Sequence, residues 1–215
     1  MTRFKVCCIR SIEEAALALR HGAAALGLVS AMPSGPGVIA DDVIRRIALW
    51  APPSTRTFLL TARTDADDIA RQVWDSKTNT VQLVDSVPLP SLAKLRRLLP
   101  DVRLVQVVHV RGETSVQEAL QIAPLVDELL LDSGNPSLAV KELGGTGRLH
   151  YWNLSRRIVE LAGVPVWLAG GLNTANARRA IEAVRPHGLD VCTGLRLNGA
   201  LDVSLLEEFA RAVSG

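Results

Sequence analysis

The chain has 215 residues, of which 48% are hydrophobic and 21% charged, and this composition excludes an intrinsically disordered protein. Lys and Arg number 24 and Asp and Glu number 22, so the formal net charge is only +2. That charge and an aromatic content of 4% argue against a nucleic-acid partner, which needs clustered basic residues or stacking rings. We expect a single domain, residues 1–215, that acts on a small molecule.

The cysteines and the apolar segments indicate a cytoplasmic protein. Cys7, Cys8 and Cys192 are too few for a disulfide framework, and no Cys/His cluster has metal-binding spacing. The longest uncharged stretch, residues 23–40, is interrupted by glycines and prolines and cannot form a continuous membrane helix. The first residues lack the long apolar segment of a signal peptide. We therefore expect a reducing compartment, no membrane partner and no bound metal.

Short apolar runs alternate with helical patterns along the whole chain. Each run predicts a strand: residues 4–9, 24–30, 57–61, 80–83, 103–110, 128–132, 165–169 and 189–193. Each following pattern predicts a helix: residues 11–22, 41–50, 65–74, 89–99, 114–122, 153–162, 175–184 and 204–213. At the start of the first helix, Ser11 is a predicted cap, with Glu14 three places on.

Eight strand–helix pairs, at a spacing of roughly 27 residues, are typical of a (βα)₈ TIM barrel, an α/β fold. Continuously apolar strands separated by helices indicate a parallel sheet that helices cover. The alternative is a doubly wound open sheet. No G-x-G-x-x-G follows the first strand, and eight units exceed what such a sheet usually holds, so the barrel is favoured.

In such a barrel the active site lies where the strands end, on the loops that follow them. The predicted strand ends are Cys7, Ser30, Leu60, Leu83, His109, Asp132, Gly170 and Thr193.

Alternation along the strands predicts which of these side chains face inward. If Cys7 faces the barrel interior, Lys5 and Ile9 face it too, while Val6 and Cys8 pack beneath the helices. A thiol and the carboxyl of Asp132 could then face one another across the barrel mouth. Each residue also has a plainer interpretation: a buried cysteine as a small apolar side chain, an aspartate as a turn residue, and His109 as part of the core.

Three glycine-rich segments follow the last three strands and predict a phosphate site. They are residues 144–147 (Gly-Gly-Thr-Gly), 168–173 (Leu-Ala-Gly-Gly-Leu-Asn) and 192–194 (Cys-Thr-Gly). Loops at this end of a barrel often bind phosphate through backbone N–H groups, which glycine allows to approach closely. The alternative is that they are ordinary turns at helix starts.

These segments, in this order, resemble the phosphoribosylanthranilate isomerase family, a (βα)₈ family of tryptophan biosynthesis. The resemblance spans almost the whole chain. The family's motifs K-x-C-G-I, G-A-D-A-L-G, V-Q-L-H, L-L-D, G-G-T-G, L-A-G-G-L-N and D-V-S-S-G match residues 5–9, 22–27, 81–84, 130–132, 144–147, 168–173 and 190–194.

The resemblance implies an Amadori rearrangement that opens an aminated ribose phosphate to a 1-amino-1-deoxy-ketose. An acid must protonate the ring oxygen and a base must remove the proton from C2. By motif, Cys7 is the base and Asp132 is the acid, with neither metal nor organic cofactor. The phosphate-binding residues carried over are Gly145, Thr146, Gly147, Gly170, Gly171, Thr193 and Gly194.

Several positions depart from the family pattern. The family's S-P-R-x-V segment reads Ser-Gly-Pro-Gly-Val here, so Pro36 stands where an arginine binds the anthranilate carboxylate. Cys8 replaces a glycine, Arg10 a threonine, Val84 a histidine, and Arg196 the glutamate of a G-V-E segment.

Because of these departures, the sequence does not decide whether anthranilate is the group attached to the ribosylamine nitrogen. Arg10 could supply a displaced positive charge, and Gln82 is the other candidate substrate-binding residue. The leading hypothesis is an isomerase acting on an N-substituted 5-phosphoribosylamine, as a monomer or homodimer. The alternatives are a catalytically weak or inactive barrel that binds a phosphorylated metabolite, or an isomerase with a different substrate.

Overall fold

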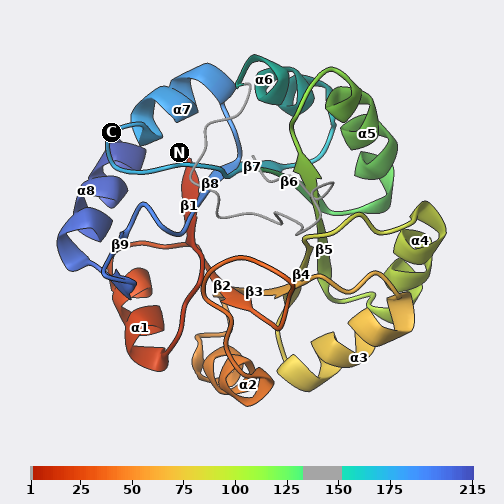
Figure 1. The fold of residues 1–215 in the computed structure, drawn as a ribbon, viewed down its shortest axis with the longest axis horizontal. Helices are drawn as coiled ribbons and strands as arrows, with labels where there is room; N and C mark the ends of the chain where they lie inside the picture. Colours follow the sequence, from red (N-terminus) through yellow and green to blue (C-terminus); the bar gives the residue numbers. More distant parts are fainter. Residues whose placement is uncertain (1, 133–151) are drawn as a thin grey trace.

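In the computed structural model, residues 2–132 and 152–215 are described. Their eight parallel strands follow one another around a closed barrel, and β8 pairs with β1 to complete it. Figure 1 shows the helices as a ring outside these strands. The barrel strands are β1 (Arg3–Val6), β2 (Ala25–Val29), β3 (Arg56–Thr61), β4 (Thr80–Leu83), β5 (Arg103–His109), β6 (Glu128–Asp132), β7 (Val166–Leu168) and β8 (Gly188–Val191).

The helices alternate with the strands in chain order, as the (βα)₈ prediction requires. They are α1 (Ile12–Arg20), α2 (Asp41–Trp50), α3 (Ala66–Ser76), α4 (Leu89–Leu98), α5 (Thr114–Ile122), the 3₁₀ helix η1 (Ala123–Leu125), α6 (Trp152–Leu161), α7 (Ala177–Val184) and α8 (Val203–Ser214). The predicted fold class is therefore confirmed. None of the helices in the described part of the chain is both long and apolar enough to cross a membrane.

Most observed bounds lie within a residue or two of the predicted ones, and two further differences lie around the junction of β1 with β8. The strands predicted for residues 4–9 and 189–193 end earlier, at Val6 and Val191. The chain leaves the sheet at Cys8, whose φ of 63° lies in the left-handed region that a strand cannot continue through. An unpredicted hairpin of β9 (Arg196–Leu197) and β10 (Ala200–Leu201) precedes α8, with left-handed residues at Asn198 and Gly199 in its turn.

The core has two layers, because alternate side chains of each strand point inside the barrel or outward beneath the helices. The outer layer is the larger and holds most of the aliphatic side chains. Inside the barrel, the rings of Phe58 and Trp167 pack edge to face with centroids 5.8 Å apart. The Trp167 ring lies where a side chain on Gly188 would stand, so this glycine makes room for it at the amino end.

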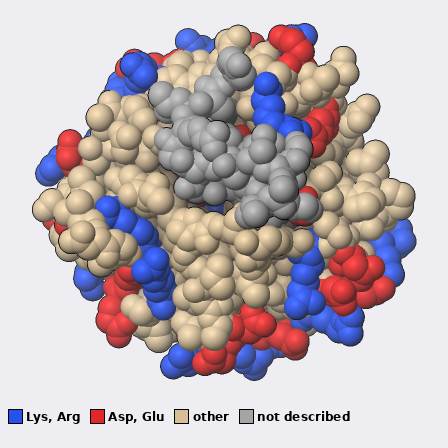
Figure 2. Space-filling view, in the orientation of Figure 1, with Lys and Arg blue, Asp and Glu red and all other residues tan. Residues whose placement is uncertain are grey.

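Local signals in the sequence set the direction of the first helix. The Ser11 side chain accepts a hydrogen bond from the amide of Glu14 at 3.3 Å, so the predicted cap is confirmed. The cap fixes where the chain turns after β1. Around the face shown in Figure 2, charged side chains of both signs alternate at the periphery, in keeping with the small net charge.

Candidate active site

A cavity opens at the carboxyl ends of the strands, and both candidate catalytic residues line it. Five of the predicted strand ends face it: Cys7, Leu60, Asp132, Gly170 and Thr193. Ser30, Leu83 and His109 do not. The cavity is also lined by Cys8, Val29, Met32, Ser34, Gly35, Pro36, Gln82, Val84, Leu130, Ala169, Gly171, Leu172, Asp190, Val191 and Cys192.

Cys7 is held just beyond the end of β1. Its amide donates to the carbonyl of Val191 at 2.8 Å, which continues the β1–β8 pairing by one residue. Its side chain lies over Gly27 of β2, where an added β-carbon would come within 2.8 Å of the sulfur. The missing side chain at Gly27 therefore makes the seat for the Cys7 sulfur.

The surroundings of Cys7 keep its thiol protonated. Burial is the main cause that raises its pKa from 9.0 to about 12, and the negative charge of Asp190 raises it further. The charges of Lys5 and Arg196 and a hydrogen bond from the Cys8 amide act in the opposite direction. A base at this position therefore needs help to lose its proton.

A buried polar network lies beneath Cys7, inside the barrel. Lys5 is fully buried, and its Nζ lies 3.0 Å from Oδ2 of Asp190, 2.5 Å from Oε1 of Gln82 and 4.4 Å from the Phe58 ring centre. Burial raises the pKa of Asp190, while the ion pair with Lys5 lowers it. The other carboxylate oxygen, Oδ1, is buried without a hydrogen-bond partner among the described residues. Lys5 thus faces inward as predicted.

The prediction for the next two residues was wrong. Cys8 does not pack beneath the helices but lines the cavity and belongs to the interior cluster, while Ile9 belongs to the outer layer. The left-handed backbone of Cys8 interrupts the alternation of a strand, so the side chains after it face the opposite way.

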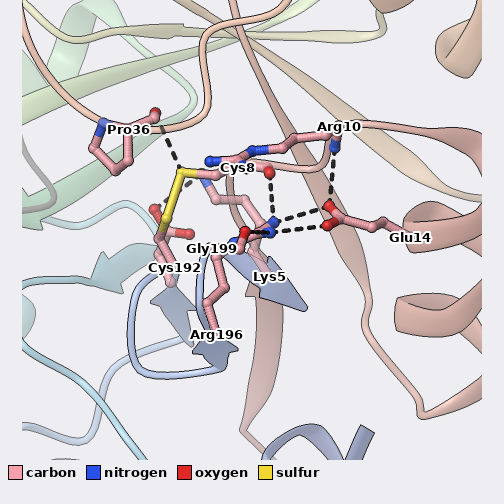
Figure 3. The surroundings of a disulfide bond; sticks show 9 residues. Lys5, Cys8, Arg10, Glu14, Pro36, Cys192, Arg196 and Gly199 are labelled. Atoms are coloured by element: carbon pink, nitrogen blue, oxygen red, sulfur yellow. Dashed lines mark hydrogen bonds and ion pairs between the residues drawn. A yellow bond between two sulfur atoms is a disulfide. The ribbon is translucent and has the colours of Figure 1, made fainter. Parts of the chain in front are cut away.

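Cys8 is joined to Cys192 by a disulfide, which the cysteine count did not predict (Figure 3). The two residues are 184 apart in sequence, but pairing of β1 with β8 brings their Cα atoms to 6.0 Å. The disulfide connects the loop that carries Cys7 to the loop after β8. Cys7 itself is a free, buried cysteine.

The predicted phosphate residues fall into three groups. Gly170 and Gly171 line the cavity with φ values of 88° and 66°, which only glycine adopts readily. Thr193 lines it from the loop after β8. Gly194 does not line the cavity, but its backbone packs so closely on Leu172 and Asn173 that no side chain would fit. Gly145, Thr146 and Gly147 lie outside the described residues.

Of the two candidate substrate-binding residues, the structure brings only Gln82 to the cavity. Arg10 is exposed and lines a separate groove with α1 and α2, because the turn at Cys8 carries it away from the barrel axis. His109 is buried, with Nε2 3.2 Å from the carbonyl of Val84, and burial lowers its pKa. It therefore stays neutral in the core, as its plainer interpretation predicted.

The loop after β2 forms the wall where the family's arginine is missing. Met32, Ser34 and Pro36 line the cavity there. Gly37 packs against Cys8 so tightly that a side chain on it would overlap the Cys8 β-carbon, and the Pro36 carbonyl oxygen lies 3.5 Å from the Cys8 sulfur. Asp132 and Asp190 are the acidic side chains among the described residues of the lining.

Sequence reasoning missed the Lys5–Asp190 pair and the Cys8–Cys192 bridge. The available signal for the pair was a lysine and an aspartate inside otherwise apolar strands, where a buried charge requires a partner. Among the described residues, no three His, Cys, Asp or Glu side chains form a group that could hold a metal.

Comparisons with known proteins agree on one family. A model described as "N-(5'phosphoribosyl)anthranilate (PRA) isomerase" matches residues 4–212. The N-(5'-phosphoribosyl)anthranilate isomerase of Methanocella arvoryzae is 33% identical over 214 residues, covering 99% of this chain and 98% of that protein.

Solved structures agree as well. The phosphoribosyl anthranilate isomerase of Thermotoga maritima has 27% identity and a TM-score of 0.85, covering 100% of this chain and 99% of its own. A phosphoribosyl anthranilate isomerase in complex with reduced 1-(o-carboxyphenylamino)-1-deoxyribulose 5-phosphate has 25% identity and a TM-score of 0.82, covering 100% and 99% of the two chains. The matched length and these full-length similarities place this chain in the N-(5'-phosphoribosyl)anthranilate isomerase family.

Proposed function

We propose that the protein catalyses the Amadori rearrangement of phosphoribosylanthranilate in tryptophan biosynthesis. The observation that carries this proposal is that Cys7 and Asp132 line one cavity together with the glycine loop 170–171. The related enzyme solved with a reduced carboxyphenylamino-deoxyribulose 5-phosphate supports the substrate class, since that compound has both a phosphate and an aromatic carboxylate.

Each group in the cavity has a role in this reaction. Backbone N–H groups around Gly170, Gly171 and Thr193 hold the phosphate, which leaves the ribose ring between Cys7 and Asp132. Asp132 donates its proton to the ring oxygen as the C1–O bond breaks, and an iminium ion forms. Cys7 removes the proton from C2, and the C2–H electrons form the enolamine that tautomerises to the ketose.

Proton removal by Cys7 needs the thiolate, whereas the thiol is the resting form because burial raises its pKa to about 12. The thiol must first release its proton to water, and the positive charge that develops on the iminium then stabilises the thiolate, since opposite charges a few ångströms apart attract one another strongly in a buried site. Burial, which raises the pKa of Cys7 and keeps the thiolate scarce, also makes that thiolate a strong base.

The carboxylate of the anthranilate ring would lie against the loop after β2. With Pro36 in place of an arginine, that carboxylate loses a charge-assisted hydrogen bond of about 1.5–3 kcal/mol. We therefore expect weaker substrate binding than in a family member that keeps the arginine, with the acid–base chemistry retained.

We further propose that residues 1–215 act as one cytoplasmic domain, as a monomer or homodimer that uses no cofactor and binds neither nucleic acid nor membranes. A solved structure from Thermotoga maritima, at 24% identity, is described as generated monomers of a dimeric phosphoribosylanthranilate isomerase. In a reducing cytoplasm the Cys8–Cys192 pair would exist as two thiols.

The test is turnover of freshly prepared phosphoribosylanthranilate, followed by loss of its fluorescence. We expect activity in the unmodified protein and a decrease in kcat of roughly 10²- to 10⁴-fold in Cys7→Ala and in Asp132→Asn. Asp101→Asn, at an exposed turn before β5, is the matched control and should keep full activity. Turnover that survives both catalytic substitutions together would refute the mechanism; binding of ribose 5-phosphate without turnover would favour a binding-only barrel.

A further inference from the structure

Arg196, at the start of β9, connects three separate segments beside the cavity (Figure 3). Its Nη2 donates to the carbonyl of Cys8 at 2.5 Å, and its Nη1 donates to the carbonyl of Gly199 at 3.0 Å. Both of its terminal nitrogens lie 2.9 Å from the carboxylate of Glu14 in α1. Only 6% of the Arg196 side chain is exposed. Its guanidinium is therefore buried between the Glu14 carboxylate and the two backbone carbonyls.

Glu14 makes this connection rigid. Besides the pair of bonds from Arg196, it accepts the amide of Arg10 at 3.0 Å and the amide of Leu201 at 3.4 Å. Burial raises the pKa of Glu14, but the bonds from Arg196 and Arg10 outweigh it and hold the pKa below its usual value. The carboxylate therefore stays charged at neutral pH, and α1 and the β9–β10 hairpin are held to the same cation.

The carbonyl that Arg196 holds belongs to the residue immediately after Cys7. Cys8 is a non-glycine residue with φ of 63°, a conformation that costs free energy and persists only where neighbours impose it. The Cys8 carbonyl lies one residue beyond the Cys7 Cα, so holding that carbonyl restrains the backbone from which the Cys7 side chain projects. The family motif K-x-C-G-I has a glycine at this position, and glycine would adopt this conformation without such a restraint.

We propose that Arg196 is a positioning residue of this active site, and that its hydrogen bond to the Cys8 carbonyl holds the Cys7 sulfur against the substrate. The inference rests on the proposed function for its catalytic part, but not for its effect on Cys7. Cys8 and Arg196 both depart from the family motifs quoted above: the turn at residue 8 carries a β-carbon, and residue 196 carries the cation that restrains this turn.

The test compares Arg196→Met and Arg196→Lys with Arg56→Met. Arg56 is a matched control, because it makes a buried ion pair with Glu128 at 2.8 Å at the amino end of the barrel, away from the cavity. Its loss should destabilise the fold without moving Cys7. For Arg196→Met we expect kcat to fall by roughly 10- to 100-fold with KM changed less than about threefold, since a displaced base slows chemistry more than binding. Arg196→Lys should restore part of kcat.

A second measurement needs no substrate: the rate at which iodoacetamide alkylates Cys7 in oxidised protein, where Cys7 is the free cysteine. Burial is the largest cause that raises the pKa of Cys7, and the charge of Arg196 is the smallest of the causes that lower it, so a loosened turn should speed alkylation although a positive charge is lost. We expect a severalfold faster rate in Arg196→Met, a rate near the unmodified one in Arg196→Lys, and no change in Arg56→Met.

The outcomes separate the two proposals. If the unmodified protein turns over no phosphoribosylanthranilate, the proposed function fails, while the alkylation rates still decide whether Arg196 positions Cys7. An unchanged alkylation rate in Arg196→Met overturns the inference, and so does a faster rate in an active enzyme whose kcat is unaffected. Equal effects of Arg196→Met and Arg56→Met on every readout show a structural role alone and overturn it as well.

Discussion

The Cys7 sulfur rests on Gly27, and a β-carbon at Gly27 would approach that sulfur to 2.8 Å and the Cys7 Cα to 3.0 Å. Two neighbouring strands thus fix the position of the candidate base: β1 leads to it and β2 leaves the space for it. Gly27 contributes only backbone to this contact, so the Cys7 side chain is the part that would have to move.

Gly27→Ala should therefore displace Cys7. We expect kcat to fall by roughly 10- to 100-fold and the free energy of unfolding to fall by about 1–3 kcal/mol, the cost of overpacking. Steady-state kinetics and urea unfolding measure the two effects. Gly112→Ala is the control, since nothing lies within 4 Å of its added β-carbon. Wild-type kcat in Gly27→Ala would show that this seat does not position the base.

Asp190→Asn should lower the pKa of Cys7. The Asp190 charge is the second-largest cause that raises this pKa, and its removal leaves the nearby Lys5 cation unopposed. Faster alkylation of Cys7 at pH 8 is the readout. Breaking the buried pair should also cost about 3–5 kcal/mol of stability. Asp42→Asn, on the surface of α2, should change neither quantity, and slower alkylation in Asp190→Asn would contradict the prediction.

The raised pKa of Cys7 makes the fold sensitive to alkaline pH. In the unfolded chain the thiol ionises near 9.0, whereas in the fold it ionises near 12, so between these values the folded state binds more protons. Stability contributed by this group is fully present below pH 9 and decreases by up to about 1.4 kcal/mol per pH unit above it. Cys7→Ala should remove that part of the slope between pH 9 and 10.5 in denaturant unfolding. An identical slope in both proteins would contradict it.

The disulfide predicts a thiol count and a stability difference. Oxidised protein, unfolded without reductant, should take up one alkyl group per chain, and reduced protein three, as measured by mass spectrometry. Because the bridge closes a long loop, its reduction should lower the free energy of unfolding by about 2–4 kcal/mol. The double variant Cys8→Ser, Cys192→Ser should be as stable as the reduced protein and indifferent to reductant. Three alkyl groups in air-oxidised protein would show that the bridge does not form.

Pro36→Arg should strengthen binding of phosphoribosylanthranilate. A guanidinium at this wall of the cavity would supply a charge-assisted partner, which the described residues of the lining do not offer to a carboxylate. Such a partner is worth about 1.5–3 kcal/mol, or roughly 10- to 100-fold in KM. Salt should weaken the gain, because an ion pair near solvent is screened. Pro36→Gln, which lacks the charge, is the control. An equal KM in the two variants would mean that the carboxylate binds elsewhere.

The sequence predicted the barrel well because its signals are local and repeated. Thr80–Leu83, Glu128–Asp132 and Asp41–Trp50 have the predicted bounds, since each is an apolar or amphipathic run with clear polar or turn residues on both sides. Strand ends then placed Cys7 and Asp132 at one rim, because parallel strands of a closed barrel all end on the same face.

Contacts between residues far apart in the sequence could not be predicted from these local signals. Cys8 and Cys192 meet only because the last strand pairs with the first, and nothing near either residue in the sequence indicates the other. The position of the Arg10 side chain was open in the sequence, because a single left-handed residue, Cys8, redirects the chain before it. A left-handed backbone at a non-glycine residue such as Cys8 depends on tertiary contacts, here with Arg196 and Gly37. Sequence patterns do not report such contacts.

The contacts between β1 and β8 also order events in time. Cys7 precedes all but the first of the eight barrel strands along the chain, whereas Asp190, Cys192 and Arg196 lie in or after the eighth, so Cys7 is synthesised well before them. A nascent chain that holds the first seven strands therefore has its candidate base without the carboxylate, the bridging thiol or the guanidinium that fix its surroundings. If Cys7 is the base, we expect competence for catalysis to arise only when β8 pairs with β1, so a chain that lacks β8 should be inactive.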